Sequence, residues 1–138
     1  MTAPRLRWAI VWVRLDPVEG EEQRGIKPAL VVSEEAFHAA NRLTVVPILP
    51  GVTTERLPGS VVLPEDPALG LPKGGLAVPS ELRTISVLRL AQERMTGFAP
   101  VLADPLIRWR IRSSLAEHLG LDLTPAADGA PPSAGWYR

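Results

Sequence analysis

Short runs of β-branched and aromatic residues, each stopped by proline or glycine, fill the first two-thirds of this chain. Runs of about four to eight such residues bounded by turn residues are typical of β-strands. The runs are residues 8–15, 29–32, 43–49, 60–63, 76–78 and 82–85, with a shorter one at 94–97. Pro47 lies inside the third run. Because proline has no backbone N–H, it predicts an edge strand or a bulge at that point.

A single helical pattern follows these runs. Asp104 can cap a helix and Pro105 suits its first turn. Apolar residues then recur at every fourth position from Ile111 to Leu119, and Gly120 is placed to end the helix. We expect one further short helical turn at residues 33–41. Five to seven short strands followed by one amphipathic helix predict a mainly β protein, a small curled antiparallel sheet or barrel with a C-terminal helix.

Length and composition predict one globular domain. The chain has 138 residues, of which 46% are hydrophobic and 22% charged, so it is neither disordered nor long enough for several ordinary domains. Residues 124–138 are rich in proline, alanine and glycine and are expected to form a flexible tail. No apolar run approaches the roughly 20 residues of a membrane helix, and no signal pattern opens the chain. We therefore expect a cytoplasmic protein without membrane contact.

Charge and metal-ligand content exclude several classes of site. Fifteen basic residues balance fifteen acidic ones, so any nucleic-acid surface must concentrate its basic residues in one place. The absence of cysteine excludes disulfides, iron–sulfur clusters and cysteine-bound zinc. His38 and His118 lie 80 positions apart in unlike contexts. We expect neither a metal nor another cofactor, and we interpret His38 as a surface or capping residue rather than a catalytic one.

Six segments, in a fixed order, resemble one known family. They are residues 10–17 (IVWVRLDP), 20–23 (GEEQ), 27–33 (KPALVVS), 43–48 (LTVVPI), 75–78 (GLAV) and 82–85 (LRTI). Residues 88–90 (LRL) and a helix ending at 119–121 follow them. Their order and spacing, over roughly residues 7–121, are similar to those of the MazF/PemK family of toxin–antitoxin endoribonucleases. On this resemblance, residues 1–123 are the toxin domain.

The resemblance implies both a fold and an activity. The fold is an SH3-like antiparallel β-barrel of the MazF/PemK/CcdB type with a C-terminal helix, usually as a homodimer. The activity is that of the toxin component of a type II toxin–antitoxin system, an mRNA interferase that cleaves single-stranded RNA without a metal. A cognate antitoxin is the implied protein partner. Because the same fold also serves toxins that act on DNA gyrase, the fold alone does not identify the target.

Two positions depart from the family pattern. The strand-opening arginine, a principal catalytic residue of the family, is replaced here by Lys27. Arginine grips phosphate bidentately, whereas lysine offers one compact charge that can also release a proton. The hydroxyl residue near the end of the third strand is replaced by Leu49, which cannot hydrogen-bond a phosphate. Thr53 or Thr54 could supply a hydroxyl from the loop that follows.

The remaining candidates are matched by position. Glu22 and Gln23, with Arg24 beside them, correspond to the loop that shapes the RNA site in the family. Arg83 and Thr84 correspond to a basic-then-hydroxyl pair that faces the substrate. These residues, with Lys27, are the candidate catalytic and RNA-binding set, and Glu81 is added as a candidate general base.

Three interpretations follow from these matches and departures. The first is an active endoribonuclease that uses Lys27, Arg83 and Glu81. The second is a catalytically weakened relative that binds antitoxin or RNA without efficient cleavage, as Lys27 and Leu49 suggest. The third is a toxin with another target, such as DNA gyrase. The matches at Glu22, Gln23, Arg83 and Thr84 favour the first interpretation over the third.

Overall fold

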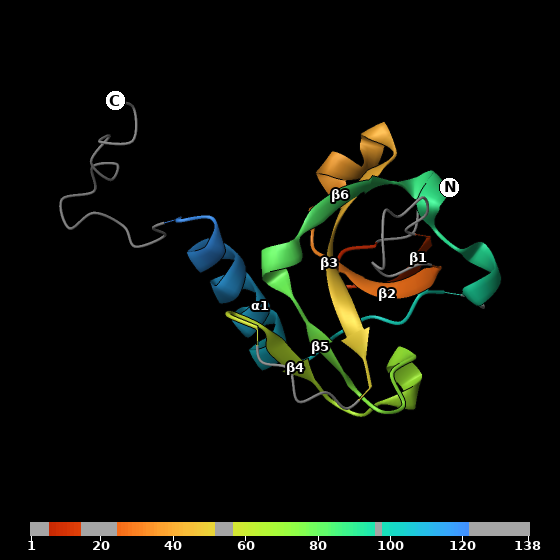
Figure 1. Ribbon diagram of the computed structural model, residues 1–138. Helices are drawn as coiled ribbons and strands as arrows, with labels where there is room; N and C mark the ends of the chain where they lie inside the picture. The colour runs from red at the N-terminus through yellow and green to blue at the C-terminus, as the bar shows by residue number, and fades with distance from the viewer. Residues whose placement is uncertain (1–5, 15–24, 52–56, 96–97, 122–138) are drawn as a thin grey trace.

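A curled antiparallel sheet with one helix packed against it forms the protein (Figure 1). The computed structural model describes residues 6–14, 25–51, 57–95 and 98–121. Its strands are β1 (Ile10–Arg14), β2 (Ile26–Val31), β3 (Arg42–Pro50), β4 (Val61–Leu63), β5 (Gly75–Ala77) and β6 (Arg83–Ser86). The strand order is β1-β2-β3-β5-β4, and β6 also pairs with β3. The predicted class, antiparallel β with a C-terminal helix, is confirmed, although β1 and β4 do not pair to close a barrel within the described residues.

Short helical segments connect the strands. They are the 3₁₀ turns η1 (Glu35–Ala40), η2 (Pro67–Leu69), η3 (Pro79–Glu81), η4 (Val87–Arg89) and η5 (Gln92–Arg94). The turn expected at residues 33–41 is therefore present, as a 3₁₀ turn that ends at Asn41 in the left-handed region. The strand predicted at 94–97 is wrong at Arg94, which closes η5. Residues 96 and 97 lie outside the described residues.

The helix α1 (Pro105–His118) begins and ends where its sequence predicts. The Asp104 carboxylate accepts hydrogen bonds from the backbone N–H groups of Leu106 and Ile107, which satisfies two of the donors left free in a first helical turn. Ile107 and Ile111 are buried against the sheet. Within the described residues no helix is long and apolar enough to cross a membrane.

Pro47 lies inside the central strand rather than at an edge. Along one side of β3 the partner changes, from β6 at residues 42–45 to β5 at residues 48–50. The carbonyl of Pro47 accepts the N–H of Val78 on that side, so the missing N–H of Pro47 also points there, into the gap between the two partners. The predicted edge or bulge is therefore wrong, because the change of partner removes the need for that donor.

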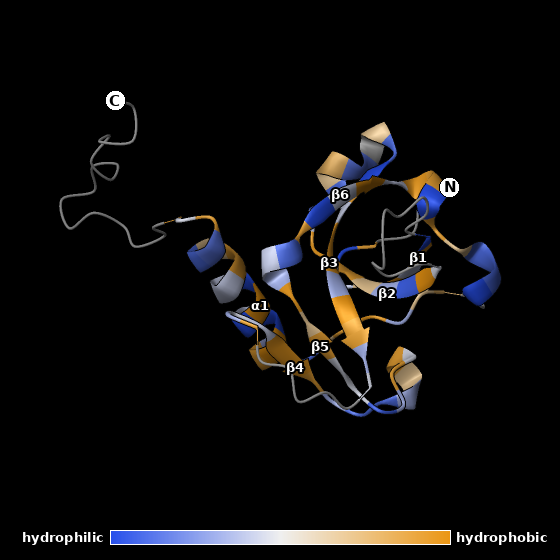
Figure 2. Ribbon diagram, viewed as in Figure 1, coloured by the Kyte–Doolittle hydropathy of each residue, from blue (hydrophilic) through white to orange (hydrophobic). Residues whose placement is uncertain are grey.

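The sheet buries hydrophobic residues in two clusters. Figure 2 shows hydrophobic stretches, in orange, along β3 and β4. One cluster lies between the sheet and α1 and includes Ile10, Leu30, Ile48 and Ile111. The other cluster consists of Ala9, Val11, Val13, Ala29, Val31, Leu43, Val45 and Ile85. We call the surface of the sheet that carries this second cluster the open face. Near-continuous burial explains why the strands read as apolar runs rather than as alternating patterns.

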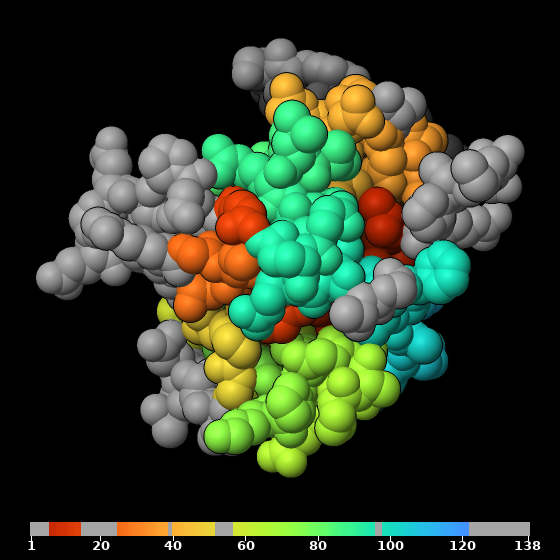
Figure 3. All heavy atoms as spheres, turned by 90° about the vertical axis from the view of Figure 1, so that its right-hand side faces the viewer, coloured from red at the N-terminus to blue at the C-terminus, as the bar shows by residue number. Residues whose placement is uncertain are grey.

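Residues 87–95 cover part of the open face and the free edge of β1 (Figure 3). Val87, Leu90 and Met95 pack against the second cluster. The N–H of Ala91 bonds the carbonyl of Trp12 at 2.8 Å, and Leu90 forms a bridge with Val13. This segment therefore supplies the edge of β1 with part of the backbone pairing that an edge strand otherwise lacks.

Candidate functional site

Lys27 is a half-buried cation at the start of β2. Its register partner on β1 is Val13, and opposed residues of an antiparallel pair share a face, so Lys27 projects from the open face. Within the described residues no carboxylate lies at ion-pair distance from its amine. A partly desolvated cation without an internal partner is able to bind an external anion.

Leu49 lies across the sheet from Lys27. β2 and β3 pair Ala29 with Pro47, and the same register extended by two positions sets Lys27 opposite Leu49. Leu49 then pairs with Leu76 of β5, which pairs with Val62 of β4. Lys27 therefore stands between Val13 of β1 and an apolar row that crosses β3, β5 and β4.

Arg83, Thr84 and Glu81 form a second group beyond β3. Arg83 and Thr84 are exposed on β6, and Glu81 is exposed on η3. The Thr84 hydroxyl lies 2.9 Å from that of Thr44 on β3. Arg83 pairs with Val45 and so projects from the open face, as Lys27 does.

The register separates Lys27 from Arg83. Arg83 is opposite Val45, and Lys27 is in line with Leu49, four residues further along β3. With about 3.3 Å per residue along the strand and two inter-strand steps of about 4.8 Å, their Cα atoms would be about 16 Å apart on a flat sheet. The two cations therefore project from the open face on the two strands that flank β3, at positions four residues apart along it.

The loop candidates Glu22, Gln23 and Arg24 lie outside the described residues, as do Thr53 and Thr54. Their assignment remains a prediction. Among the residues that are described, no three histidine, cysteine, aspartate or glutamate side chains gather closely enough to hold a metal ion.

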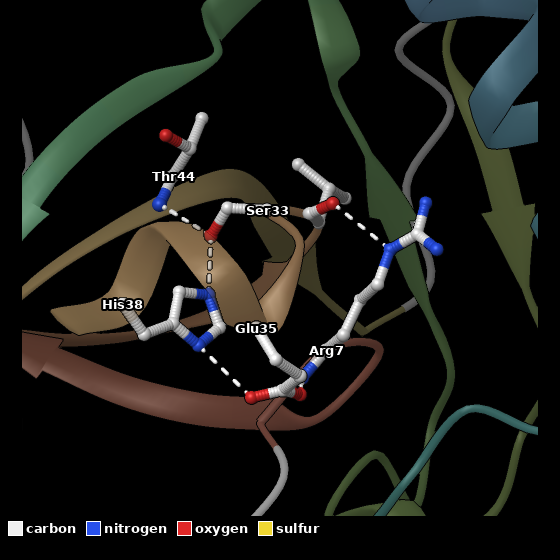
Figure 4. Close-up of polar contacts among 6 residues, drawn as sticks. Arg7, Ser33, Glu35, His38 and Thr44 are labelled. Carbon is white, nitrogen blue, oxygen red and sulfur yellow. Dashed lines mark hydrogen bonds and ion pairs between the residues drawn. The ribbon is translucent and has the colours of Figure 1, made fainter.

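Sequence reasoning missed a polar network around His38 (Figure 4). The imidazole Nε2 lies 2.7 Å from the Ser33 hydroxyl, and Nδ1 lies 3.1 Å from the Glu35 carboxylate. An ionised carboxylate only accepts hydrogen bonds, so Nδ1 carries a proton and, in the neutral ring, Nε2 accepts from Ser33. Ser33 in turn accepts the N–H of Thr44 at 3.0 Å, and Glu35 accepts the N–H of Arg7 at 2.7 Å.

This network fastens η1 to the end of β2, to β3 and to the N-terminal segment, and we call it the Ser33 network (Ser33, Glu35, His38, with the Thr44 and Arg7 N–H groups). The His38 side chain is 12% exposed. The surface interpretation of His38 is therefore replaced by a structural one. The signal that could have found it is the i, i+3 spacing of Glu35 and His38 on a helical turn.

A second missed feature is a group of charged residues around Trp12 at the free edge of β1. We call it the β1 edge cluster, and it consists of Trp12, Arg14, Arg89, Glu93 and Arg94. The Arg94 guanidinium lies 4.5 Å from the centroid of the Trp12 ring, and Arg14 forms an ion pair with Glu93. Arg89 donates to the carbonyl of Arg14. No local pattern predicts this gathering, because residues 89–94 reach β1 only through tertiary pairing.

Comparison with known proteins identifies the family. Residues 6–102 match the model of the PemK-like, MazF-like toxin of type II toxin–antitoxin system family. The chain belongs to this family. The endoribonuclease PemK of Escherichia coli is 33% identical over 87 residues, which are 62% of this chain and 64% of that protein. The matched part thus spans less than two-thirds of that relative.

Solved structures of the family share the fold. The crystal structure of MazF from Deinococcus radiodurans superposes with a TM-score of 0.62 at 23% identity, over 87% of this chain and 100% of that one. An endoribonuclease in complex with its cognate antitoxin, from Mycobacterial species, gives 0.63 at 24%, over 88% and 100%. At this identity the likeness establishes the fold, and the chemistry depends on the residues described above.

Proposed function

We propose that this chain is the toxin of a toxin–antitoxin pair and a metal-independent endoribonuclease for single-stranded RNA, with catalysis weakened at Lys27 and Leu49. The observation that carries the proposal is Lys27, a half-buried cation without a carboxylate partner in the described part of the chain, at the position of the family arginine. The name of the E. coli relative, endoribonuclease PemK, supports the reaction class.

The proposed reaction is an internal transesterification. A base removes the proton of a ribose 2′-hydroxyl, and its oxygen attacks the adjacent phosphorus. The bond from phosphorus to the 5′-oxygen breaks, and an acid protonates that oxygen. The products are a 2′,3′-cyclic phosphate and a free 5′-hydroxyl. Lys27 stabilises the additional negative charge on the phosphate oxygens as it develops.

The other candidates take separate roles. The Cα atoms of Lys27 and Arg83 would be about 16 Å apart on a flat sheet, and we propose that their side chains contact neighbouring phosphates of one RNA strand. Thr84 pairs with Thr44 and so projects from the face opposite to Arg83, where we propose that it contacts RNA. Glu81 remains the candidate base because it is an exposed carboxylate two residues from Arg83. Glu22, Gln23 and Arg24 are proposed to contact RNA from their loop.

Leu49 is the reason to propose a weakened enzyme. The hydroxyl donor expected opposite Lys27 is missing, and losing one such donor typically costs about 10²–10³ in rate. Lys27 adds a further loss, because a single ammonium group cannot form the paired hydrogen bonds of a guanidinium.

The apolar row from Leu49 to Val62 favours a second candidate function, in which the chain binds its antitoxin without efficient cleavage. Leu76 in the middle of the row is buried, but Val62 is 62% exposed and Leu49 half-buried, and exposed apolar residues near an unpaired cation suit a protein partner that carries both apolar and acidic residues. This candidate differs from the first only in the rate of RNA cleavage, because a protein antitoxin partners the chain in both.

We also propose a homodimer. Trp109 and Leu106 on α1 are 60% and 53% exposed, and a dimer interface on this helix would bury both. Sedimentation at micromolar concentration should give a species of twice the 14.9 kDa chain mass. A single species at the chain mass would contradict the dimer.

Incubation with long single-stranded RNA in EDTA, followed by mapping of the ends, tests the activity. We expect slow cleavage at a short recurrent sequence, leaving cyclic phosphate and 5′-hydroxyl ends. Cleavage that occurs only when a divalent metal is added would contradict the proposed chemistry. Intact RNA, with tight binding of the antitoxin, would favour the second candidate.

A further inference from the structure

The β1 edge cluster concentrates positive charge in a chain whose overall charge balances. It holds three arginines and one carboxylate, Glu93, which pairs with Arg14. Arg94 is exposed, and within the described residues no carboxylate lies within ion-pair distance of it. Composition requires that any RNA surface of this chain be a local concentration of basic residues, and this cluster is one.

The cluster also provides a flat surface. The Arg94 guanidinium rests on the Trp12 ring at 4.5 Å from its centroid, and Trp12 itself is only half-buried. The ring contacts the guanidinium from one side, and Arg94 is exposed to solvent. Unpaired nucleobases stack on aromatic rings and on guanidinium planes, and arginine does this where lysine does not.

The position of the cluster connects it to the candidate site. Val13, the residue next to Trp12, is the register partner of Lys27, and Arg14 pairs with Ile26. In Figure 3 the atoms of β1, β2 and residues 87–95 meet on one surface. Because successive residues of a strand project from opposite faces, Trp12 and Arg14 project from the face opposite to Lys27. An extended strand whose phosphate lies at Lys27 therefore reaches Arg94 by passing around the edge of β1.

We propose that the β1 edge cluster is a nucleobase subsite for single-stranded RNA, in which one unpaired base stacks on the Arg94 guanidinium and Trp12 holds that guanidinium in place. Arg14 and Arg89 contribute positive charge along the adjoining backbone. The inference rests on the proposed function, because it takes the same RNA as ligand. It adds a specificity-determining residue that lies outside the position-matched catalytic set.

The test is equilibrium binding of a fluorescent single-stranded oligonucleotide with 2′-O-methyl groups throughout, which removes the attacking hydroxyl and so separates binding from cleavage. Fluorescence anisotropy would be measured for the natural protein, Arg94→Lys and Arg94→Ala. Arg110→Lys, an equally conservative change of an exposed arginine on α1, is the matched control. Unfolding midpoints would establish that each variant is folded.

Arg94→Lys keeps the positive charge but removes the planar guanidinium group on which a base would stack. We expect it to weaken binding by roughly 5- to 50-fold, the loss of one stacked base, with the salt dependence unchanged. Arg94→Ala should weaken binding at least as much and reduce the salt slope by about one. Arg110→Lys should leave binding unchanged.

A series of oligonucleotides with one abasic position each identifies the stacked base. Removing the stacked base should weaken binding to the natural protein. With that oligonucleotide, the natural protein and Arg94→Lys should bind with equal affinity. If Arg94→Lys binds as tightly as the natural protein, or if no abasic position removes the difference, the subsite is refuted while RNA binding stands. If the natural protein binds no oligonucleotide, the proposed function fails and the subsite with it.

Discussion

Polar residues near the two ends of β2 differ in whether they have partners within the protein. Just past the C-terminal end, in the Ser33 network, each polar group has an internal partner: Ser33 contacts His38 and the Thr44 N–H, and His38 contacts Glu35. Arg7 adds an ion pair with Glu34. At the N-terminal end Lys27 has no acidic partner among the described residues, and Leu49 faces it across the sheet.

This difference separates residues that stabilise the fold from residues available to a ligand. A buried hydrogen bond contributes about 0.5–1.5 kcal/mol, so a fully paired network is explained by stability alone. An unpaired, half-buried cation has no such explanation, and proteins commonly accept a stability cost at functional sites. Changes at the Lys27 end should therefore alter activity, and changes at the Ser33 end should alter stability.

The largest effect on the rate of RNA cleavage is expected from restoring the arginine and the hydroxyl residue that Lys27 and Leu49 replace. Leu49→Thr should raise RNA cleavage by about 10²–10³, because it returns a hydroxyl donor to the phosphate. Adding Lys27→Arg should raise the rate further, and more than additively if both groups hold the same phosphate. Rates on one RNA in EDTA would be compared for the four variants. If the natural protein already cuts as fast as the double variant, Leu49 and Lys27 do not weaken catalysis.

Removing the unpaired cation should have the next largest effect. Lys27→Met keeps the length of the side chain and should lower cleavage by about 10²-fold, because it removes the charge that faces the phosphate. The free energy of unfolding should change by less than about 0.5 kcal/mol, since no internal partner is lost. Lys73→Met, at an exposed loop residue, is the control. A large loss of stability in Lys27→Met would show that Lys27 has a structural partner and would end the comparison.

At the other end of β2, substitutions should lower stability and leave RNA binding nearly unchanged. Ser33→Ala leaves both the Thr44 N–H and His38 without their partner. Because these groups are part-buried, the loss should lie near the lower end of the about 1–3 kcal/mol that an unpaired buried polar group costs. Urea unfolding should show this loss, while oligonucleotide binding stays within about two-fold of the natural protein. Ser113→Ala, at an exposed position of α1, is the control. Lost RNA binding with unchanged stability would instead place the Ser33 network in the RNA site.

The sequence predicts the elements well because each depends on local residues. The six strands and α1 follow from β-branched runs, proline and glycine stops, and the Asp104 cap. The role of Pro47 could not be predicted, because the gap that accommodates it exists only where β6 gives way to β5 along β3.

In the candidate site too, the sequence predicts individual residues, whereas tertiary pairing decides which of them lie together. Resemblance named Lys27 and Leu49 separately, and they are set opposite each other only when the β2–β3 register is extended two positions beyond the Ala29–Pro47 pair. The Glu35 and His38 spacing was visible in the sequence, but the N–H that completes the network comes from Thr44, eleven residues beyond Ser33. The β1 edge cluster joins residues about eighty positions apart, a distance at which local patterns contain no information.

The smallest expected effect is a difference in stability cost between substitutions of two neighbouring carboxylates, Glu34 and Glu35. Glu34 forms an ion pair with Arg7 at 2.8 Å, but its side chain is 58% exposed, and exposed pairs contribute little because water and salt screen them. Glu34→Gln should therefore cost less than about 0.5 kcal/mol, and that cost should vanish in 1 M salt. Glu35 accepts from both the Arg7 N–H and His38, so Glu35→Gln removes two charge-assisted bonds and should cost about 1 kcal/mol or more at any salt concentration. Urea unfolding of both variants at low and high salt measures the difference. If both variants lose the same free energy of unfolding, the network is stabilised by net charge near η1 rather than by its individual hydrogen bonds. The two ends of β2 would then differ only in charge density.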